Sequence, residues 1–405
     1  MASDLRSCVH NKIGLAMADD GDFDFKPRQD GPTPGASGVI GAAKIPNGNG
    51  AAKISPSPHP TIKPDLRLPG FFEGSASIGA KPFRPQTITP QTITPQDSLR
   101  FDLKVDERGY AWWYVDALSD DRKYALTIIA FIGSVFSPYY AWSKSQNPFN
   151  HCALNVALYG PDKSRWCMTE RGSKDIQISA QEFVIGPSAV SWDGTTLTIN
   201  IEELGAPLPQ RVKGTVKVRP PWISNQAMVI DRFGKHIWHP LSPSSRVEVD
   251  MASPDLSWSG DAYLDSNHGE EPLAEGFDYW DWSRSILGNG EAAITYNTDF
   301  ADGGRQSLAL LFDNHGELEM FKGPPIQPMP STPIWRITRR TRCEKSSSPR
   351  IVKTLEDVPF YSRSVIETRL FGKDFHTVHE SLSCHRLRSP VVKSLLPFRM
   401  PRLAR

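Results

Sequence analysis

Residues 189–201 read Ala-Val-Ser-Trp-Asp-Gly-Thr-Thr-Leu-Thr-Ile-Asn-Ile, and this stretch decides the fold class. The Asp193-Gly194 dipeptide is typical of a two-residue β-hairpin turn, because both residues tolerate the positive φ angles that such a turn requires. On either side of it, Ala189–Trp192 and Thr195–Ile201 are short runs of β-type residues, and polar and apolar side chains alternate in the second run. The stretch therefore predicts two antiparallel strands joined by a tight turn.

Similar short runs, separated by turn residues, recur along the chain. They are Tyr110–Val115, Tyr124–Phe131, Cys152–Tyr159, Arg165–Thr169, Phe183–Ile185, Val212–Val218, Ala227–Ile230, Arg246–Met251, Gly260–Asp265, Ala292–Asn297, Ser307–Phe312, Leu318–Phe321 and Trp335–Arg340. Many strands at a spacing of roughly 8–12 residues, with few long helical stretches, are typical of an all-β barrel or sandwich. The strands are too many for one small barrel, so we expect two packed β-domains with a boundary around residues 220–240.

The N-terminal quarter has a different composition. Residues 1–97 contain 13 Pro and 11 Gly, whereas all 11 Trp and all 10 Tyr lie from Tyr110 onward. The segment also repeats Gln-Thr-Ile-Thr-Pro back to back at 86–90 and 91–95. Such a stretch buries too little apolar surface to offset the entropy of ordering it. We expect a disordered tail over 1–97 and a folded body from residue 98.

The overall charge balance excludes some classes of partner. There are 46 Lys+Arg against 45 Asp+Glu, a formal net charge of +1, so no basic footprint for nucleic acid is present. The five cysteines are few and widely separated, and without a CxxC pair they indicate reduced thiols. The N-terminus lacks a secretory apolar region, and the apolar stretch Ala125–Tyr140 is interrupted and shorter than a bilayer span. We expect neither secretion nor integral membrane insertion.

Aromatic and polar side chains are densest between Lys235 and Trp282. Residues two apart on a strand share a face, so His236 pairs with Trp238 and Tyr263 pairs with Asp265. If both strands line one cavity, a carboxyl, an imidazole and two rings converge on apolar space. A desolvated Asp has a raised pKa and keeps its proton, which a general acid requires.

A plainer interpretation of the same cluster stays open. Trp and Tyr in β-proteins are usually core residues, and Asp265-Ser-Asn-His268-Gly is equally a strand-ending turn. Elsewhere, His376 and His379 would lie on opposite faces of a strand, which suits a metal poorly. No dinucleotide fingerprint, P-loop or nucleophile elbow is present. Any catalysis is therefore expected to be acid–base work without a cofactor or metal.

Long blocks of the sequence carry a resemblance to a known family. They are Gly109–Asp116, Leu126–Tyr140, Asn150–Gly160, Trp166–Arg171, Tyr263–Pro272, Leu355–Tyr361, His379–Ser383 and Leu396–Pro401. Across residues 98–402 the chain resembles the carotenoid 1,2-hydratases of purple photosynthetic bacteria, also called hydroxyneurosporene synthases. The first 97 residues match nothing in that family.

The resemblance implies an activity and a fold. It implies addition of water across the terminal 1,2 double bond of acyclic carotenoids such as neurosporene and lycopene, giving tertiary alcohols in the spheroidene and spirilloxanthin pathway. It implies no organic cofactor and two tandem lipocalin-like β-domains enclosing an apolar cavity. The family's functional residues fall on His236, Trp238, Tyr263 and Asp265.

These expectations give a division of the chain and a hypothesis for the site. The division is a disordered tail 1–97, a first lipocalin-like domain 98–235, a second domain 236–388 carrying the cluster, and a basic amphipathic tail 389–405. In the hypothesis Asp265 donates the proton and His236 orients it or activates water. Trp238 and Tyr263 would flank the carbocation.

Two other functions fit the same residues. A non-catalytic lipocalin-like carrier of a polyene would share the fold and the aromatic cavity, and a different acid-catalysed isomerase or cyclase would share the acid. A substrate that lives in membrane also implies peripheral association with the cytoplasmic side of the inner or intracytoplasmic membrane. The segment Ser389–Arg405 and the apolar Phe131–Tyr140 region are the candidate contacts, although a plain basic tail explains the first equally well.

Overall fold

The computed structural model describes residues 90–92, 99–162 and 164–403. The expected disordered tail therefore lies almost entirely outside the described residues. Within it, β1 (Gln91–Thr92) pairs antiparallel with β11 (Gln226–Val229) through Gln91↔Ala227 and Thr92↔Gln226. The second Gln-Thr-Ile-Thr-Pro copy thus contributes backbone to the folded body.

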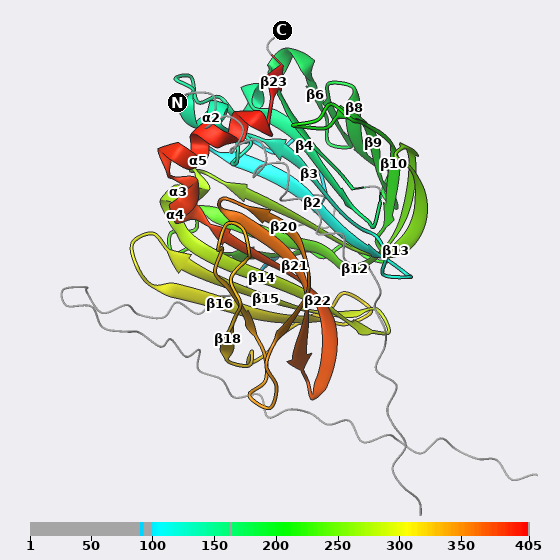
Figure 1. Ribbon diagram of the computed structural model, residues 1–405, viewed down its shortest axis with the longest axis vertical. Coiled ribbons are helices and arrows are strands. Elements are labelled where there is room, and N and C mark those ends of the chain that lie inside the picture. Colours follow the sequence, from blue (N-terminus) through cyan, green and yellow to red (C-terminus); the bar gives the residue numbers. More distant parts are fainter. Residues whose placement is uncertain (1–89, 93–98, 163, 404–405) are drawn as a thin grey trace, which may run out of the picture.

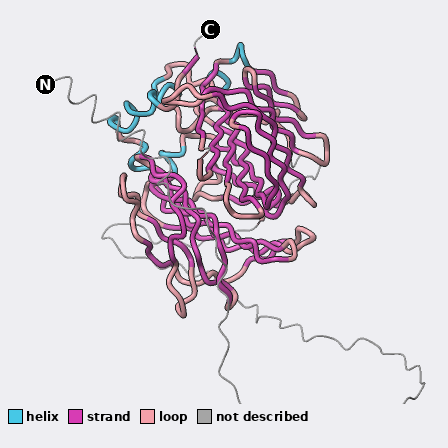
Figure 2. The backbone as a smooth tube through the Cα atoms, turned by 45° about the vertical axis from the view of Figure 1, so that its right-hand side comes forward, coloured by secondary structure: helices cyan, strands magenta, loops and turns pink. Residues whose placement is uncertain are grey.

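The larger of two β-sheets curls around its own interior (Figures 1 and 2). Among the described residues it has 14 strands, of which β1 and β11 lie off the main path. That path runs β23 (Arg402–Leu403), β5 (Arg165–Arg171), β4 (Cys152–Tyr159), β3 (Ala125–Ile132), β2 (Tyr110–Ser119), β13 (Asp255–Gly269), β12 (His236–Ser253), β10 (Arg211–Arg219), β9 (Leu197–Leu204), β8 (Ser188–Trp192), β7 (Glu182–Ile185) and β6 (Ile176–Ile178). Its neighbours are antiparallel except for β23, which runs parallel to β5.

The second sheet has seven strands in the described part of the chain and packs against the first (Figure 1). Its order is β17 (Leu318–Met320), β16 (Arg305–Phe312), β15 (Glu291–Phe300), β14 (Phe277–Gly288), β22 (Lys373–Ser383), β21 (Tyr361–Leu370) and β20 (Arg350–Val358). A small pair, β18 (Ile326–Met329) and β19 (Arg339–Arg342), contacts β14 and β22. The all-β class with two packed sheets is confirmed.

The hairpin on which the prediction began is also confirmed. Strands β8 and β9 pair antiparallel, with Trp192 opposite Leu197, and Gly194 between them has φ = 98°. Eight strands of the described residues were not predicted, among them the short β1, β6, β18 and β23. The four longest are β14, β20, β21 and β22 of the second sheet. These four strands carry polar side chains on both faces. Both faces of the second sheet are buried against neighbours, so the sequence does not show the regular alternation of apolar and polar residues that marks a strand with one face in solvent.

The expected boundary at 235/236 does not coincide with the change of sheet. Strands β12 and β13 belong to the first sheet, where β13 pairs with β2 over ten residues from Gly269↔Tyr110 to Gly260↔Ser119. The chain passes to the second sheet only between Gly269 and Phe277. The turn of the β12–β13 hairpin lies near Pro254. The sequence around 220–240 therefore gives no local sign that the following hairpin belongs to the first sheet.

Short helices gather at one end of the two sheets (Figure 2). They are α2 (Pro138–Trp142), α3 (Leu273–Gly276), α4 (Cys384–Leu387), α5 (Pro390–Leu395) and the 3₁₀ turns η2 (Pro148–Asn150) and η4 (Leu396–Phe398). Another 3₁₀ turn, η3 (Ser173–Asp175), connects β5 to β6 in the first sheet. In the described residues no helix combines the length and apolarity that a bilayer crossing requires.

The segment expected as a basic tail is built into the body. Arg399 pairs with the buried Glu356, and Arg402 pairs with the buried Glu170. Leu396 and Met400 are buried beside them. The segment was expected to be a basic tail because it holds four basic residues and no acidic ones, but the acidic partners of Arg399 and Arg402 lie on β20 and β5.

The two faces of the first sheet bury different kinds of side chain. Inside its curl lies an aliphatic core, which includes Val115, Ile128, Val156, Ile199, Val216, Val249 and Leu264. Between the two sheets lies an aromatic core, which includes Tyr110, Trp112, Tyr114, Trp238, Tyr263, Trp280, Trp282 and Tyr296. Because side chains alternate along a strand, β2 and β13 each contribute to both cores.

Candidate active site

A hollow of about 1220 Å³, its opening included, lies within the aromatic core between the two sheets. The first sheet supplies Trp112, Tyr114, Thr127, Ile129, Phe131, Asn155, Trp166, Met168, Asp265 and Asn267 to its wall, and the second sheet supplies Trp280, Trp282, Tyr296, Glu356, Val358, Tyr361, Glu380 and Leu382. The helical end adds Phe136, Leu395, Leu396, Arg399 and Met400. A mostly aromatic wall with a few polar groups suits a long apolar ligand.

Asp265 stands in this wall with its carboxyl only 5% exposed. It lies on β13, where alternation directs Tyr263 and Asp265 to the aromatic core and Leu264 to the aliphatic core. The carboxyl oxygen Oδ2 accepts hydrogen bonds from Trp238 Nε1 at 2.9 Å and from the Tyr263 hydroxyl at 2.7 Å. The other oxygen, Oδ1, has only a long contact of 3.4 Å from Asn267 Nδ2. One oxygen is thus fixed and the other is left for a ligand.

The environment of Asp265 favours its protonated form. Burial raises the pKa of Asp265 to about 8, against the lowering effect of the hydrogen bonds from Trp238 and Tyr263. The negative charges of Glu380 and Asp116 raise it further. Within the described part of the chain, the hydrogen-bond partners of Asp265 are three neutral groups. A carboxyl that keeps its proton near neutral pH can serve as a general acid.

Trp238 and Tyr263 lie behind Asp265 rather than in the wall itself. Both side chains are fully buried and neither lines the hollow. Trp238 packs on Tyr296, with ring centroids 5.1 Å apart, and Tyr263 packs on Trp282 at 4.9 Å. The two residues therefore hold the carboxyl from behind, while Tyr296 and Trp282 are the rings that a ligand meets. The place of Trp238 and Tyr263 beside the ligand therefore stays a prediction, while in the structure their indole and phenol donate to Oδ2.

His236 lies apart from the other three predicted residues. It pairs across β12–β13 with Gly269, four residues and about 13 Å along the strand from Asp265. Its Nδ1 shares a 2.9 Å hydrogen bond with the Tyr110 hydroxyl, its ring packs on Phe277, and burial lowers its pKa. Alternation correctly put His236 and Trp238 on one face but does not measure distance along the strand. His236 is thus linked to the hollow through Tyr110, whose ring stacks on Trp112 at 4.8 Å.

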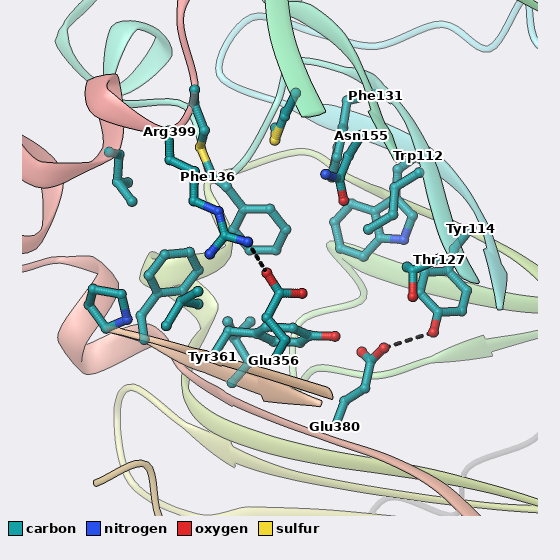
Figure 3. A pocket seen from close by; sticks show the side chains of 18 of the residues that line it. Trp112, Tyr114, Thr127, Phe131, Phe136, Asn155, Glu356, Tyr361, Glu380 and Arg399 are labelled. Atoms are coloured by element: carbon teal, nitrogen blue, oxygen red, sulfur yellow. Dashed lines mark hydrogen bonds and ion pairs between the residues drawn. The ribbon is translucent and has the colours of Figure 1, made fainter. Parts of the chain in front are cut away.

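Sequence reasoning missed a second carboxyl of the wall, Glu380 on β22 (Figure 3). Its Oε1 accepts a hydrogen bond of 2.7 Å from the Tyr114 hydroxyl and an ion pair from Arg363, a fully buried arginine of β21. Arg363 also donates to the Tyr114 hydroxyl. Glu380 lies in the block His379–Ser383 that carries the family resemblance, but its partners lie 17 and 266 positions away, so no local pattern marked it as a site residue.

A third carboxyl of the wall, Glu356, sits closer to the helical end and points into the same hollow (Figure 3). Arg399 donates to its Oε1 and the Tyr159 hydroxyl donates to its Oε2, both at 3.0 Å. Glu356 and Glu380 therefore each have an arginine and a tyrosine as partners. Asp265, with neutral donors alone, differs from both.

The described residues offer little to a metal ion. No group of three or more His, Cys, Asp or Glu among them is arranged to hold one. His379 bonds Ser283 and Ser381 on the face of the second sheet turned away from the hollow, and burial lowers its pKa to about 3. Cys152, Cys167, Cys343 and Cys384 are unpaired and buried, which agrees with the expectation of reduced thiols for these four.

A buried carboxyl of raised pKa in an aromatic cavity, between a curled sheet and a second sheet, fits a class of enzyme that has a lipocalin-like β-scaffold and an apolar substrate. A carotenoid hydratase model, CrtC, matches residues 128–405, and the chain belongs to this family. It is 52% identical over 307 residues to an acyclic carotenoid 1,2-hydratase of Thiocapsa roseopersicina, covering 75% of this chain and 76% of the relative. A relative of the same name from Rubrivivax gelatinosus is 46% identical over 310 residues, with the same coverage.

A solved structure supports the fold alone. The chain is similar to a Nitrosomonas europaea protein assigned to AttH, with a TM-score of 0.50 and 15% sequence identity, covering 73% of this chain and 99% of that one. The lipocalin-like two-sheet scaffold expected from the resemblance is confirmed.

Proposed function

We propose that the protein adds water across the terminal 1,2 double bond of an acyclic carotenoid and needs no organic cofactor to do so. Membership of the carotenoid hydratase family supplies the reaction class. The observation that carries the mechanism is Asp265, a carboxyl with a pKa raised to about 8 in a wall of aromatic rings. Neurosporene and lycopene are the substrates that we expect.

In the first step Asp265 transfers its proton to the less substituted carbon of the alkene, C2. The two electrons of the double bond form the new C–H bond, Asp265 becomes a carboxylate, and a tertiary cation remains at C1. An alkene is a very weak base, so the acid must be shielded from water, as Asp265 is. Oδ1 is the oxygen placed for this transfer, since Oδ2 already accepts two hydrogen bonds.

The cation at C1 forms among the rings of Trp112, Trp280, Trp282 and Tyr296, which line the hollow. Ring faces attract a cation, by about 2 kcal/mol or more per favourable contact when water is excluded. The new carboxylate of Asp265 adds a negative charge nearby. Capture of C1 by water, with loss of one proton from that water, completes the tertiary alcohol and balances the reaction.

A carrier of polyenes would share the aromatic hollow, so the decisive assay is chemical. Lycopene or neurosporene is supplied in detergent or liposomes in oxygen-18 water, and the product is analysed by mass spectrometry. The hydratase gives a product heavier by one labelled water. Recovery of both compounds unchanged, from folded protein that binds them, would overturn the proposal in favour of a carrier. An isomerase or cyclase would give a product of unchanged mass.

We also propose that the protein works at the cytoplasmic face of the inner or intracytoplasmic membrane. Trp142 of α2, Val391 of α5 and Phe398 of η4 are each more than half exposed at the helical end. A second hollow of about 1030 Å³, its opening included, is lined by α2 and α5 and shares Phe136 and Leu396 with the first. A substrate dissolved in lipid would have a short apolar path from this end to Asp265.

The membrane contact is tested by sedimentation with vesicles. Val391→Ser combined with Phe398→Ser is expected to lower the fraction of protein bound to vesicles of anionic phospholipid, because both apolar side chains are exposed. The matched control is Phe371→Ser, an exposed aromatic residue at the far β21–β22 turn. Equal binding of all three proteins would place the contact elsewhere.

A further inference from the structure

Hydration needs a group that accepts a proton from water, and the mechanism above leaves that group unassigned. Glu380 meets the first requirement, because its side chain faces the same hollow as Asp265 (Figure 3). It comes from the opposite wall: Asp265 is on β13 of the first sheet and Glu380 on β22 of the second. A substrate end held between the sheets would therefore have one carboxyl on each side.

Glu380 has a cationic partner and a hydroxyl partner. Arg363 is 1% exposed, so its charge is hardly screened by water, and it pairs directly with Glu380. The Tyr114 hydroxyl donates to the same oxygen, Oε1. Contacts to Oε2 do not occur among the described residues, so this oxygen is free to accept a hydrogen bond from a water molecule in the hollow.

Tyr114 connects the two carboxyls in space. It lies directly opposite Asp265 in the pairing of β2 with β13, and its hydroxyl reaches Glu380. The span between the two carboxyls is therefore on the order of one tyrosine side chain. The negative charge of Glu380 is also one of the influences that raise the pKa of Asp265. Two nearby carboxyls in different environments, one with neutral donors and one with an arginine, are the usual sign of separate acid and base roles.

We propose that Glu380 is a catalytic base that binds the attacking water and takes its proton. This inference rests on the proposed hydration. As the water oxygen bonds to C1, one O–H bond of that water breaks and its proton passes to Glu380, while the electron pair of that bond stays on oxygen. Asp265 has given one proton and Glu380 has gained one, so the enzyme is restored when a proton returns to Asp265 through solvent at the open mouth of the hollow.

The negative charge of Glu380 also acts on Asp265 before water attacks. As long as Glu380 is an anion, it opposes ionisation of Asp265 and so keeps the acid loaded. It also attracts the cation as that forms at C1, next to Trp282, which lies opposite Glu380 in the β14–β22 pairing. Glu356, the other arginine-paired carboxyl of the wall, is not one of the largest influences on Asp265.

Glu380→Gln is the decisive variant, assayed by hydration rate over a range of pH. We expect kcat to fall about 10²-fold or more and the acidic limb of the profile to disappear, since the base has been removed. The alkaline limb should move to lower pH, because the charge that raises the pKa of Asp265 is gone. Unchanged kcat with an intact acidic limb would overturn the proposal.

The matched control is Asp281→Asn. Asp281 is a buried carboxylate paired with an arginine, Arg340, on the strand next to Glu380, but it faces away from the hollow. Loss of a buried ion pair should lower its stability without changing kcat or either limb. If Asp281→Asn loses as much kcat as Glu380→Gln, Glu380 acts through structure alone and the proposal fails.

A second variant covers the case in which Glu380→Gln does not fold. Glu380→Asp keeps the charge and the arginine but withdraws the carboxylate by one methylene, so kcat should fall about tenfold with both limbs retained. Wild-type kcat in this variant would count against a base at this position. If the wild-type protein incorporates no labelled water, the proposed function fails. If the wild-type protein incorporates labelled water and the Glu380 variants hydrate at the wild-type rate, only the inference about Glu380 fails.

Discussion

The two faces of the first sheet come from the same strands but bury different kinds of side chain, and only one of them borders the hollow. On β13, Leu264 enters the aliphatic core inside the curl, while its neighbours Tyr263 and Asp265 enter the aromatic core between the sheets. The aliphatic core is made mostly of Val, Ile, Leu and Ala side chains, with Trp113 and Phe183 among them. The aromatic core holds buried carboxyls, arginines and a hollow. Both faces bury an ion pair, Arg171–Glu203 on the aliphatic side and Arg363–Glu380 on the aromatic side. The difference is the hollow, because only the aromatic face gives up close packing to leave space for a substrate.

The comparison also separates two ways of burying a carboxyl. Glu380 and Glu356 each have an arginine partner, whereas Asp265 has only neutral donors. A cation favours the ionised form, and burial without one favours the protonated form. Among the three carboxyls of the wall, Asp265 therefore differs in having no cationic partner within the described residues, and burial raises its pKa to about 8.

Asp265→Asn, on the aromatic face, should have the largest effect on activity. The amide keeps the shape of the side chain but has no acidic proton, so kcat should fall about 10³-fold or more while the folded fraction stays unchanged. The measurement is labelled-water incorporation, together with near-ultraviolet circular dichroism. Turnover close to wild type would show that the acid lies elsewhere.

Leu264→Ala is the counterpart on the other face. Removing a fully buried leucine from the aliphatic core should lower the free energy of unfolding by about 2–5 kcal/mol. Hydration per folded molecule should stay near wild type at a temperature where the variant is folded. Denaturant unfolding and an activity assay on the same sample check both parts. A large loss of kcat with normal stability would mean that the two faces are not separate.

The stability of the protein should depend on pH through Asp265. Its pKa is about 8 in the folded state and near 4 when exposed, so the folded state binds the additional proton between these values. Stability from this group is complete below about pH 4 and is lost as pH rises toward 8, by ~1.4 kcal/mol for each pH unit inside the window. Asp265→Asn should lack this loss, so its stability relative to wild type should increase with pH. Parallel curves for the two proteins would contradict the raised pKa.

Tyr263→Phe should sharpen the assignment of the donors. The Tyr263 hydroxyl lowers the pKa of Asp265, so its removal should move the alkaline limb of the activity profile to higher pH, by up to about one unit. Glu380→Gln moves the same limb in the opposite direction. A limb that does not move in Tyr263→Phe would mean that another group sets it.

His236→Asn should have the smallest effect on that limb. His236 contacts Tyr110 and Phe277 rather than Asp265, so we expect lower stability and an alkaline limb at the wild-type pH. A shifted limb would restore the original hypothesis that His236 orients the acid.

The local parts of the fold could be predicted from the sequence, and the distant ones could not. Asp193-Gly194 located a hairpin because a tight turn depends on two neighbouring residues. Alternation grouped Tyr263 with Asp265 because both lie on one strand. In contrast, the environment of Glu380 is set by Arg363 and Tyr114, and Arg399 is paired with Glu356. These partners lie as many as 266 positions apart in the sequence. The place where the chain changes sheet could not be predicted for the same reason, since only the pairing of β13 with β2 shows which sheet the hairpin joins.

The arrangement of the last described strand has a consequence for biosynthesis. Leu395, Leu396, Arg399 and Met400 close the hollow, and β23 aligns with β5, a strand made more than 200 residues earlier. Most of the first sheet can form while the ribosome is still translating, but the cavity lacks a wall until codons 395–402 have been read. A premature stop in those few codons would leave a largely folded protein whose binding site is open to water. Proteolytic trimming there would act in the same way on the finished enzyme.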